Sequence, residues 1–304
     1  MGTLDLLMEG YTVHKIKLNQ NTEKKLLIFL FTIIPVALLL LFSYYPLIKM
    51  FQYSLTDWNG ITPDPNFVGA DNYRTVLTNP NYFAVFKTSL YYFIATFFQL
   101  GIALLFATLL SFKVKFANFW KGVLFFPYLL NGVAIGFIFL YFYKGGGTLD
   151  TVLSFLGLDG QIRLWLGDRS INNIALAFTS VWRYTGFNFL IFLGAIQSVN
   201  PEIYEAAEID GASQWDKFLY IIVPSIKNII FLNIILGISG SLSVFDIPYI
   251  MTGGSNGTTT FVIQTISTAF KYNKTGLASA MGIILLMIVI VVTVIQRLAI
   301  REKR

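Results

Sequence analysis

Six stretches of mainly apolar residues, separated by polar connections, dominate the hydrophobic pattern of the chain. Each is close to the roughly 20 residues that a helix needs to cross the hydrocarbon core of a bilayer. The strict alternation of apolar and polar positions that indicates a membrane β-barrel is absent. The pattern therefore predicts six transmembrane helices, at about residues 26–45, 88–112, 122–143, 171–196, 228–250 and 277–295.

The basic residues are unevenly distributed among the connections. With six crossings, both termini lie on the same side of the membrane as the second and fourth connections. That side holds 13 of the 22 Lys and Arg residues, and the short connection at 113–121 has three lysines and no acid. Because positive residues gather on the cytoplasmic side, both termini are predicted to be cytoplasmic. The other connections, about 46–87, 144–170 and 251–276, are predicted to be ordered external loops or short surface helices.

Composition agrees with a membrane protein and excludes several kinds of site. Of the 304 residues, 55% are hydrophobic and 12% are charged, about half the charge of an average soluble domain. With no cysteine and a single histidine, His14, disulfides, thiol catalysis and zinc or iron–sulfur sites are excluded or nearly so. The net charge of +6 follows from the membrane orientation and does not indicate a nucleic-acid partner.

One predicted cytoplasmic connection is acidic. From residue 200 to 220 it carries five acids and one base. Asn200 and Pro201 are typical of the first turn of a helix, and Gly211 can adopt the positive φ angle that ends one. Between them, Ala206 and Ala207 have little bulk, so another surface can approach closely. The pattern predicts a short docking helix at about Glu202–Gly211.

A second amphipathic segment follows the glycine. Trp215, Phe218 and Ile222 recur at helical spacing, and Pro224 is predicted to start or kink the fifth transmembrane helix. An ordinary solvated acidic loop is the alternative to a docking element.

This connection resembles the EAA motif of permease subunits in binding-protein-dependent ABC importers. The matching residues are Glu205-Ala-Ala, Asp210-Gly-Ala and, farther along, Phe218, Ile221 and Pro224. Two further segments, Phe126-Pro-Tyr128 and Phe245-Asp-Ile-Pro-Tyr-Ile-Met-Thr-Gly-Gly254, resemble the MalF-like carbohydrate branch, although Ser255 stands where that branch usually has proline. The resemblance covers nearly the whole chain from about residue 25.

The resemblance implies an all-α membrane protein with the MetI-like fold of type I ABC importer permeases. It implies a second homologous permease subunit, a dimer of ABC ATPases that binds the ATP and magnesium, and an extracytoplasmic solute-binding protein that delivers a sugar. The expected location is the bacterial plasma membrane. The ATPase-coupling residues would be Glu202, Glu205, Ala206, Ala207, Asp210, Gly211 and Ala212.

The chain is then expected to divide into a cytoplasmic or interfacial segment at 1–25, a first transmembrane helix at 26–48, a permease core at 84–298 and a tail at 299–304. The core holds five transmembrane helices and the cytoplasmic loop 200–224. The first apolar run is longer than the core of a signal peptide and no cleavage pattern follows it, so it is expected to remain as a helix.

No enzyme chemistry is predicted for this chain. The phosphate-binding pattern of ATPases requires a Gly-Lys pair, and the sequence has none. The intramembrane carboxylate pairs that an ion-coupled carrier would often use are also missing, which weighs against that alternative.

Polar and aromatic residues within the predicted helices indicate a solute path. Helical spacing puts Ser180, Tyr184, Phe187 and Asn188 on one face of the fourth helix, bordered by Arg183. With the positions that the resemblance implies, the predicted path residues are Tyr128, Gly132, Ser180, Arg183, Tyr184, Phe187, Asn188, Gly237 and Ser241.

Each path residue has a structural alternative. Glycine and serine often serve close helix packing in membranes, and Arg183 could instead pair near the outer interface. Asp246 is expected to brace a helix end rather than touch the solute. The carried solute is predicted to be a carbohydrate, in particular an oligosaccharide, with a polyol, glycerol phosphate or amino sugar as alternatives on the same scaffold.

Overall fold

The computed structural model describes residues 20–112 and 114–301, and these residues are almost entirely helical, with one isolated bridge between Thr56 and Phe67. Of the predicted segments 1–25 and 299–304, residues 1–19 and 302–304 lie outside the described residues. The chain divides into two units, residues 1–52 and 53–304.

The first unit is a long helical rod. It consists of α1 (Gln20–Leu39), the π-helical turn η2 (Leu40–Tyr44) and α2 (Tyr45–Ser54), whose last two residues belong to the second unit. Residues 24–54 form a candidate membrane span with none of its most apolar window buried. A helix therefore occurs where the first span is predicted, and it extends beyond both predicted ends.

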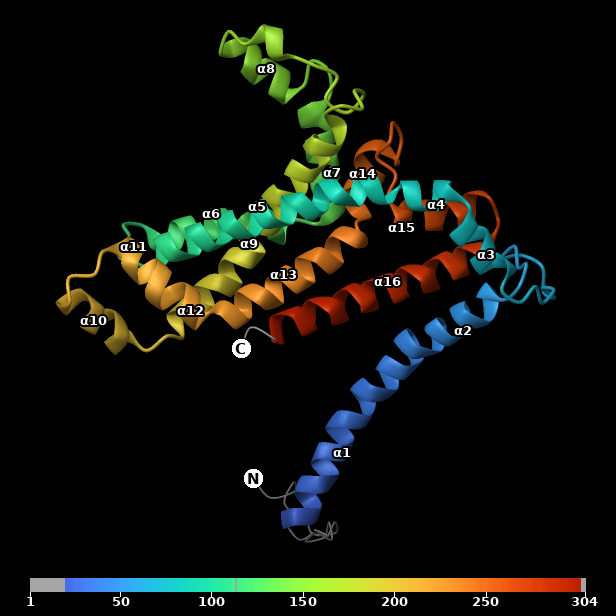
Figure 1. Ribbon diagram of the computed structural model, residues 1–304, viewed down its shortest axis with the longest axis horizontal. Helices are drawn as coiled ribbons and strands as arrows, with labels where there is room; N and C mark the ends of the chain where they lie inside the picture. The colour runs from blue at the N-terminus through green and yellow to red at the C-terminus, as the bar shows by residue number, and fades with distance from the viewer. Residues whose placement is uncertain (1–19, 113, 302–304) are drawn as a thin grey trace, which may run out of the picture. The chain divides into compact units, whose positions relative to one another are not determined.

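The second unit contains the remaining helices (Figure 1). In chain order they are α3 (Asp71–Thr78), α4 (Pro80–Ala84), α5 (Phe86–Ser111), α6 (Ala117–Leu129), α7 (Gly132–Tyr143), α8 (Thr148–Phe155), η3 (Asp159–Gln161), α9 (Asn172–Gln197), α10 (Pro201–Ile209), α11 (Gln214–Asp216), η4 (Lys217–Ile222), α12 (Val223–Ser225), α13 (Lys227–Leu242), α14 (Asp246–Thr252), α15 (Phe261–Ile266), η5 (Ser267–Lys271) and α16 (Thr275–Arg301).

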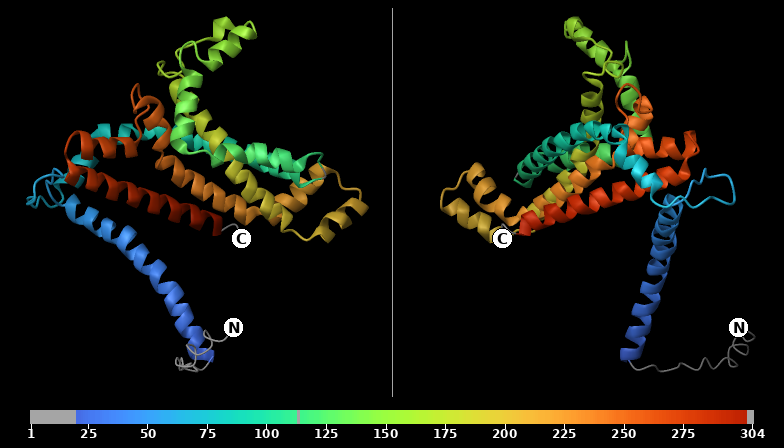
Figure 2. Two further views of the ribbon diagram at one scale, coloured as in Figure 1. Left: turned by 180° about the vertical axis from the view of Figure 1, so that it is seen from behind. Right: turned by 45° about the vertical axis from the view of Figure 1, so that its right-hand side comes forward.

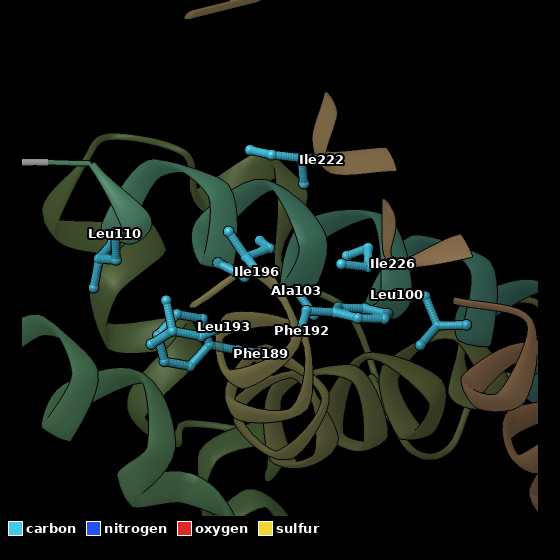
Figure 3. Packing of buried hydrophobic residues seen from close by; sticks show 10 residues of the cluster. Leu100, Ala103, Leu110, Phe189, Phe192, Leu193, Ile196, Ile222 and Ile226 are labelled. Atoms are coloured by element: carbon cyan, nitrogen blue, oxygen red, sulfur yellow. The ribbon is translucent and has the colours of Figure 1, made fainter. Parts of the chain in front are cut away.

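The main core lies where α5 packs along α9 (Figure 3). Ala103 and Ala107 of α5 are fully buried, and as small residues four positions apart they allow α9 to approach closely. Phe189 and Phe192 of α9 fill the space beside them. Two smaller clusters involve α7 with α9 and α14, and α3 with α15 and α16. The two long helices α13 and α16 run beside each other (Figures 1 and 2).

The predicted third helix, 122–143, is not one straight element. It consists of α6 and α7, which are bent by 96°. The backbone is extended at Leu130 and Asn131, and the Asn131 side chain accepts a hydrogen bond from the backbone N–H of Val133 at 2.8 Å. This side-chain cap starts a new helix where the apolar pattern alone predicts continuation. The prediction of a single continuous helix is therefore wrong.

The predicted fifth helix is also interrupted. α13 ends at Leu242, and α14 starts at Asp246. At its other end α13 begins at Lys227, directly after a break at Ile226, which agrees with the predicted effect of Pro224.

Among the described residues, four helices are long and apolar enough to cross a membrane, and a fifth span results if α6 and α7 are counted together. α9 is long enough to cross a membrane, but its polar side chains and Arg183 make it too polar to be counted among these candidate spans.

Candidate functional site

The acidic loop at residues 200–224, called the docking loop below, begins with a capped helix. The Asn200 side chain accepts a hydrogen bond from the backbone N–H of Glu202 at 3.1 Å, and Pro201 occupies the first helical turn. α10 then runs to Ile209, within two residues of the predicted end. The predicted helix and its start are confirmed, because the side chain of Asn200 satisfies a backbone donor that the helix itself leaves unpaired.

The end of α10 is a Schellman turn centred on Gly211. The N–H of Ala212 donates to the carbonyl of Ala207 at 2.9 Å, and the N–H of Gly211 donates to the carbonyl of Glu208 at 3.1 Å. Gly211 has φ of +77°, a conformation that costs other residues free energy but not glycine. The predicted role of Gly211 in ending the helix is thus confirmed.

The chain re-enters helix through a capping box at Ser213 and Asp216. The Ser213 hydroxyl accepts from the N–H of Asp216, and the Asp216 carboxylate accepts from the N–H of Ser213 at 2.9 Å. Hydrogen bonds from the Ser213 side chain and backbone lower the pKa of the Asp216 carboxyl. The second segment is π-helical from Lys217 to Ile222, and Ile222 is fully buried against the main core.

The outer surface of the docking loop combines carboxylates with exposed apolar side chains. Ile209 is 87% exposed and Trp215 63% exposed, with Trp215 stacked on Phe218 at 5.2 Å between ring centroids. Five of the predicted coupling residues are exposed, namely Glu202, Glu205, Ala206, Asp210 and Gly211, while Ala207 and Ala212 are half-buried. Exposed apolar side chains among carboxylates favour contact with another protein over full exposure to solvent.

A cavity of about 370 Å³ lies between α5, α9, α13 and residues 243–247, which lead into the first turn of α14. Its wall includes six of the nine predicted path residues: Ser180, Tyr184, Phe187, Asn188, Gly237 and Ser241. The structure therefore brings together residues from α9 and α13 that are more than 35 positions apart in sequence. Because the wall carries both hydroxyl or amide groups and aromatic rings, it can offer hydrogen bonds and flat apolar faces to one solute.

Three predicted path residues, Tyr128, Gly132 and Arg183, do not line this cavity. Tyr128 of α6 stacks behind its wall, 4.7 Å from the Phe187 ring between centroids. At Gly132 a Cβ atom would lie 2.7 Å from Nη1 of Arg183, so the glycine makes room for the guanidinium group. The structure thus favours the packing alternative for Gly132.

Asp246 lines the cavity, and Arg183, outside the wall, forms a long ion pair with it, 3.5 Å from Nη1 to Oδ2. The guanidinium group also lies over the Tyr184 ring, 4.9 Å from its centroid. Asp246 opens α14, where a carboxylate favours the positive end of the helix dipole. The ion pair supports the pairing alternative for Arg183, whereas Asp246 both starts α14 and lines the cavity.

Close packing and cavity lining coincide at Gly237. A Cβ atom there would overlap the Thr96 side chain of α5, whose hydroxyl donates to the Tyr92 carbonyl at 2.9 Å. Ser241 is buried and donates to the Ile238 carbonyl at 2.7 Å, so its hydroxyl still has acceptor capacity for a ligand.

The contribution of α5 to the cavity is absent from the predicted set. Tyr92, Thr96 and Gln99 all line the wall from this helix, together with Asn233 of α13. The hydroxyl of Tyr92 is buried without a hydrogen-bond partner in the described structure. Their positions 92, 96 and 99 share one face of a helix, so the polar pattern within an apolar span could have revealed them.

The sequence of the chain matches a family of membrane transport proteins. Residues 99–304 match the family described as "Binding-protein-dependent transport system inner membrane component". This chain is a member of that family. The match covers more than half of the permease and includes the docking loop, α9 and α13.

Several relatives match over nearly their full length. The permease is 32% identical to "Probable ABC transporter permease protein YurN" of Bacillus subtilis, over 91% of this chain and 96% of that protein. It is 33% identical to "Arabinooligosaccharides transport system permease protein AraP" of the same organism, over 90% and 88% of the two chains. It is 31% identical to "Multiple sugar-binding transport system permease protein MsmF" of Streptococcus mutans, over 88% and 92%.

The fold also matches a solved transporter structure. A chain of a bacterial ABC transporter for the acidic polysaccharide alginate superposes with a TM-score of 0.81 at 19% identity, covering 93% of the permease and 97% of that chain. The same kind of transporter in complex with its alginate pentasaccharide-bound periplasmic protein gives a TM-score of 0.79. This likeness establishes a common fold.

The comparisons confirm the predicted resemblance and the location. The permease is a multi-pass, helical inner-membrane component of a transport system, with a fold shared by ABC importer permeases. Its family is defined by transport and not by catalysis.

Proposed function

We propose that the permease forms half of the translocation path of an ATP-driven importer for a carbohydrate, in particular an oligosaccharide. The observation that carries this proposal is the cavity between α5, α9 and α13, with amides, hydroxyls and aromatic rings in one wall. Sugars present both hydroxyl groups and apolar ring faces, so this lining suits them. The names of the relatives AraP and MsmF, which refer to arabinooligosaccharides and multiple sugars, support the same class of solute.

Within the carbohydrate class, the lining favours a neutral solute. The cavity wall includes one carboxylate, Asp246, and no Lys, Arg or His side chain among the described residues. The nearest cation, Arg183, is turned to Asp246. A phosphate would enter this cavity without a charged donor and beside a carboxylate, at a high desolvation cost. The lining therefore supports a neutral oligosaccharide or polyol over glycerol phosphate.

The assembly we propose has four kinds of subunit. A second, homologous permease completes the path, an ABC ATPase dimer binds ATP and magnesium, and an extracytoplasmic protein delivers the solute. Six transmembrane helices with both termini in the cytoplasm would place the docking loop beside the ATPase. The positive charge of the other predicted cytoplasmic connections supports this orientation.

Transport then depends on the docking loop as the link to ATP. Glu202, Glu205 and Gly211, with the small residues Ala206, Ala207 and Ala212 and the carboxylate of Asp210, form the surface that the ATPase would contact. ATP binding closes the ATPase pair and moves the docking helix α10, and the path opens toward the binding protein. Hydrolysis returns it to the inward-facing state. Each step requires contacts that differ between the two states.

The proposal is tested by uptake into proteoliposomes that hold the complete transporter, its binding protein and internal ATP. We expect ATP-dependent uptake of a neutral oligosaccharide and none of glycerol phosphate. Phe187→Ala, which removes an aromatic wall, should raise the solute concentration for half-maximal uptake about 10-fold. Phe97→Ala, the same change at an exposed α5 position outside the cavity wall, is the control.

Two results would contradict this assignment. One is uptake that continues without ATP and collapses with a protonophore, which would indicate an ion-coupled carrier. The other is an equal effect of Phe187→Ala and Phe97→Ala, which would remove the cavity from the path.

A further inference from the structure

One lysine of the docking loop is buried. The side chain of Lys217 is only 3% exposed, and among the described residues no other Lys or Arg is equally covered. Its Nζ atom lies 2.7 Å from Oε1 of Glu208, whose side chain is 66% exposed. An ammonium group removed from water is strongly destabilising unless a carboxylate compensates it. The burial of Lys217 therefore depends on Glu208.

Glu208 in turn depends on Lys217. It lies in the last turn of α10, where the carbonyl groups of the helix carry partial negative charge. A carboxylate at this end is disfavoured by the helix dipole, and a cation beside it removes the penalty. The pair is therefore mutually stabilising and has short, direct geometry, unlike the 3.5 Å pair at Arg183.

The two residues belong to different helical segments. Glu208 is on α10, and Lys217 is the first residue of η4, on the far side of the turn at Gly211. η4 is anchored by Ile222 in the main core, and the chain continues through α12 into α13. α13 supplies Gly237 and Ser241 to the cavity wall. The pair thus connects the docking helix to the start of a helix that lines the cavity.

A second link fastens the other end of α10. The Tyr204 hydroxyl donates to the carbonyl of Ile196 near the end of α9, at 3.4 Å, and the Tyr204 ring packs against the main core. Without Glu208–Lys217, the two segments would still be joined by the glycine turn, and a glycine backbone allows many conformations. A displacement of α10 would then rotate the backbone at Gly211 instead of moving η4.

We propose that Glu208 and Lys217 are a positioning pair that makes α10 and the start of α13 move as one body, so that displacement of α10 by the ATPase reaches the cavity. This inference rests on the proposed function. Neither residue needs to touch the ATPase or the solute for this role. The pair determines how much movement is transmitted, not whether the subunits bind each other.

The test compares three variants in the reconstituted transporter: Lys217→Met, Glu208→Gln and Lys217→Arg. Glu208→Gln changes a largely exposed side chain, so it tests the pair even if Lys217→Met does not fold. The number of ATP molecules hydrolysed per solute imported should rise about 3- to 10-fold in Lys217→Met and Glu208→Gln, which lies within the roughly 2- to 30-fold effects of residues that couple distant sites. Lys217→Arg should retain the wild-type ratio.

The matched control is Lys227→Met. Lys227 is exposed at the start of α13, ten positions from Lys217, so this variant makes the same chemical change outside the pair. Its ratio should equal that of the wild type. Co-purification of the ATPase should be unchanged in all variants, because the proposed role of the pair is to join α10 to η4 and not to bind the ATPase.

A distance measurement tests rigidity directly. The chain has no cysteine, so spin labels can be placed by Ile209→Cys and Tyr220→Cys, at residues that are 87% and 76% exposed. The distribution of distances between the labels should broaden in Lys217→Met and Glu208→Gln and stay narrow in Lys227→Met.

Two results would overturn the inference. A wild-type ATP ratio and a narrow distance distribution in both Lys217→Met and Glu208→Gln would show that the pair transmits nothing. Loss of ATPase co-purification would assign the pair to the docking surface instead. If the proposed solute is wrong, the wild-type transporter will not import it. If only the role of the pair is wrong, the wild type will import the solute and the variants will have its ATP ratio and its distance distribution.

Discussion

The contacts within the docking loop and the contacts within the cavity wall span very different distances in sequence. In the docking loop, the hydrogen bonds that define the turns join residues three to five positions apart, such as Asp216 to Ser213 and Ala212 to Ala207. In the cavity wall, Thr96 of α5 lies against Gly237 of α13, 141 positions away. Local sequence therefore determines the shape of the docking loop, whereas the cavity exists only once distant helices have packed.

The largest effect is expected from Gly211→Val. A branched side chain at φ of +77° costs about 1–2 kcal/mol and disrupts the Schellman turn, so uptake should be lost while the protein remains in the membrane. Uptake into proteoliposomes and ATPase co-purification measure this.

Gly157→Val is a close control for that change. Gly157 ends α8 in the same kind of turn, with φ of +72° and a 2.8 Å hydrogen bond from the N–H of Leu158 to the carbonyl of Leu153. The local strain is similar, but the site is outside the docking loop. If both variants lost uptake equally, general destabilisation would explain the result and the special role of the Gly211 turn would be refuted.

A smaller effect on uptake is expected from Gly186→Ala, which tests a contact between helices that are distant in sequence. A Cβ atom at this α9 position would overlap the backbone of Leu124 and Phe125 in α6. The two helices must separate, at a cost of about 1–3 kcal/mol, and the stacking of Tyr128 on Phe187 should weaken. The melting temperature and the solute affinity should both fall.

Gly194→Ala provides the control on the same helix. Gly194 has open space around the position of its missing Cβ atom, so the substitution should leave stability unchanged or raise it slightly through better helix propensity. Equal melting temperatures for the two variants would show that the contact between α6 and α9 contributes little to the cavity wall.

The smallest effect is expected from Ser213→Ala in the capping box. Because hydrogen bonds from Ser213 lower the pKa of Asp216, this pair stabilises the fold above the usual pKa of the carboxyl, and the contribution disappears as the pH falls through the lowered value. At neutral pH the melting temperature of the variant should be lower by about 3 °C or less. The difference should shrink on acidification, and a difference that grows instead would contradict the assigned hydrogen bonds.

Sequence patterns predict the docking loop well because its turns depend on residues that are neighbours in sequence. Asn200, Gly211 and Pro224 each impose their effect on the adjoining backbone, so the helix start, the turn and the break are readable in order. The apolar runs likewise reveal long helices at 20–54, 86–111 and 275–301. Family resemblance adds the role of the loop as a coupling element, which remains a prediction.

The cavity is predicted only in part. Helical spacing assembles Ser180, Tyr184 and Phe187 correctly because they share one helix face. It cannot show that α5 faces them with Tyr92 and Gln99, or that Arg183 is turned toward Asp246, because these contacts depend on packing between distant segments. The break at Asn131 is missed for another reason, since one side-chain cap outweighs an uninterrupted apolar pattern.

That break has a consequence for how the protein is made. With 13 and 12 residues, α6 and α7 would extend about 20 Å and 18 Å, and neither reaches across a hydrocarbon core of about 30 Å. α6 packs on α9, and α7 packs on α14, both of which are synthesised later. We therefore expect the two short helices to reach the membrane before these later partners exist, and this part of the permease to complete its insertion only after the downstream sequence has been made.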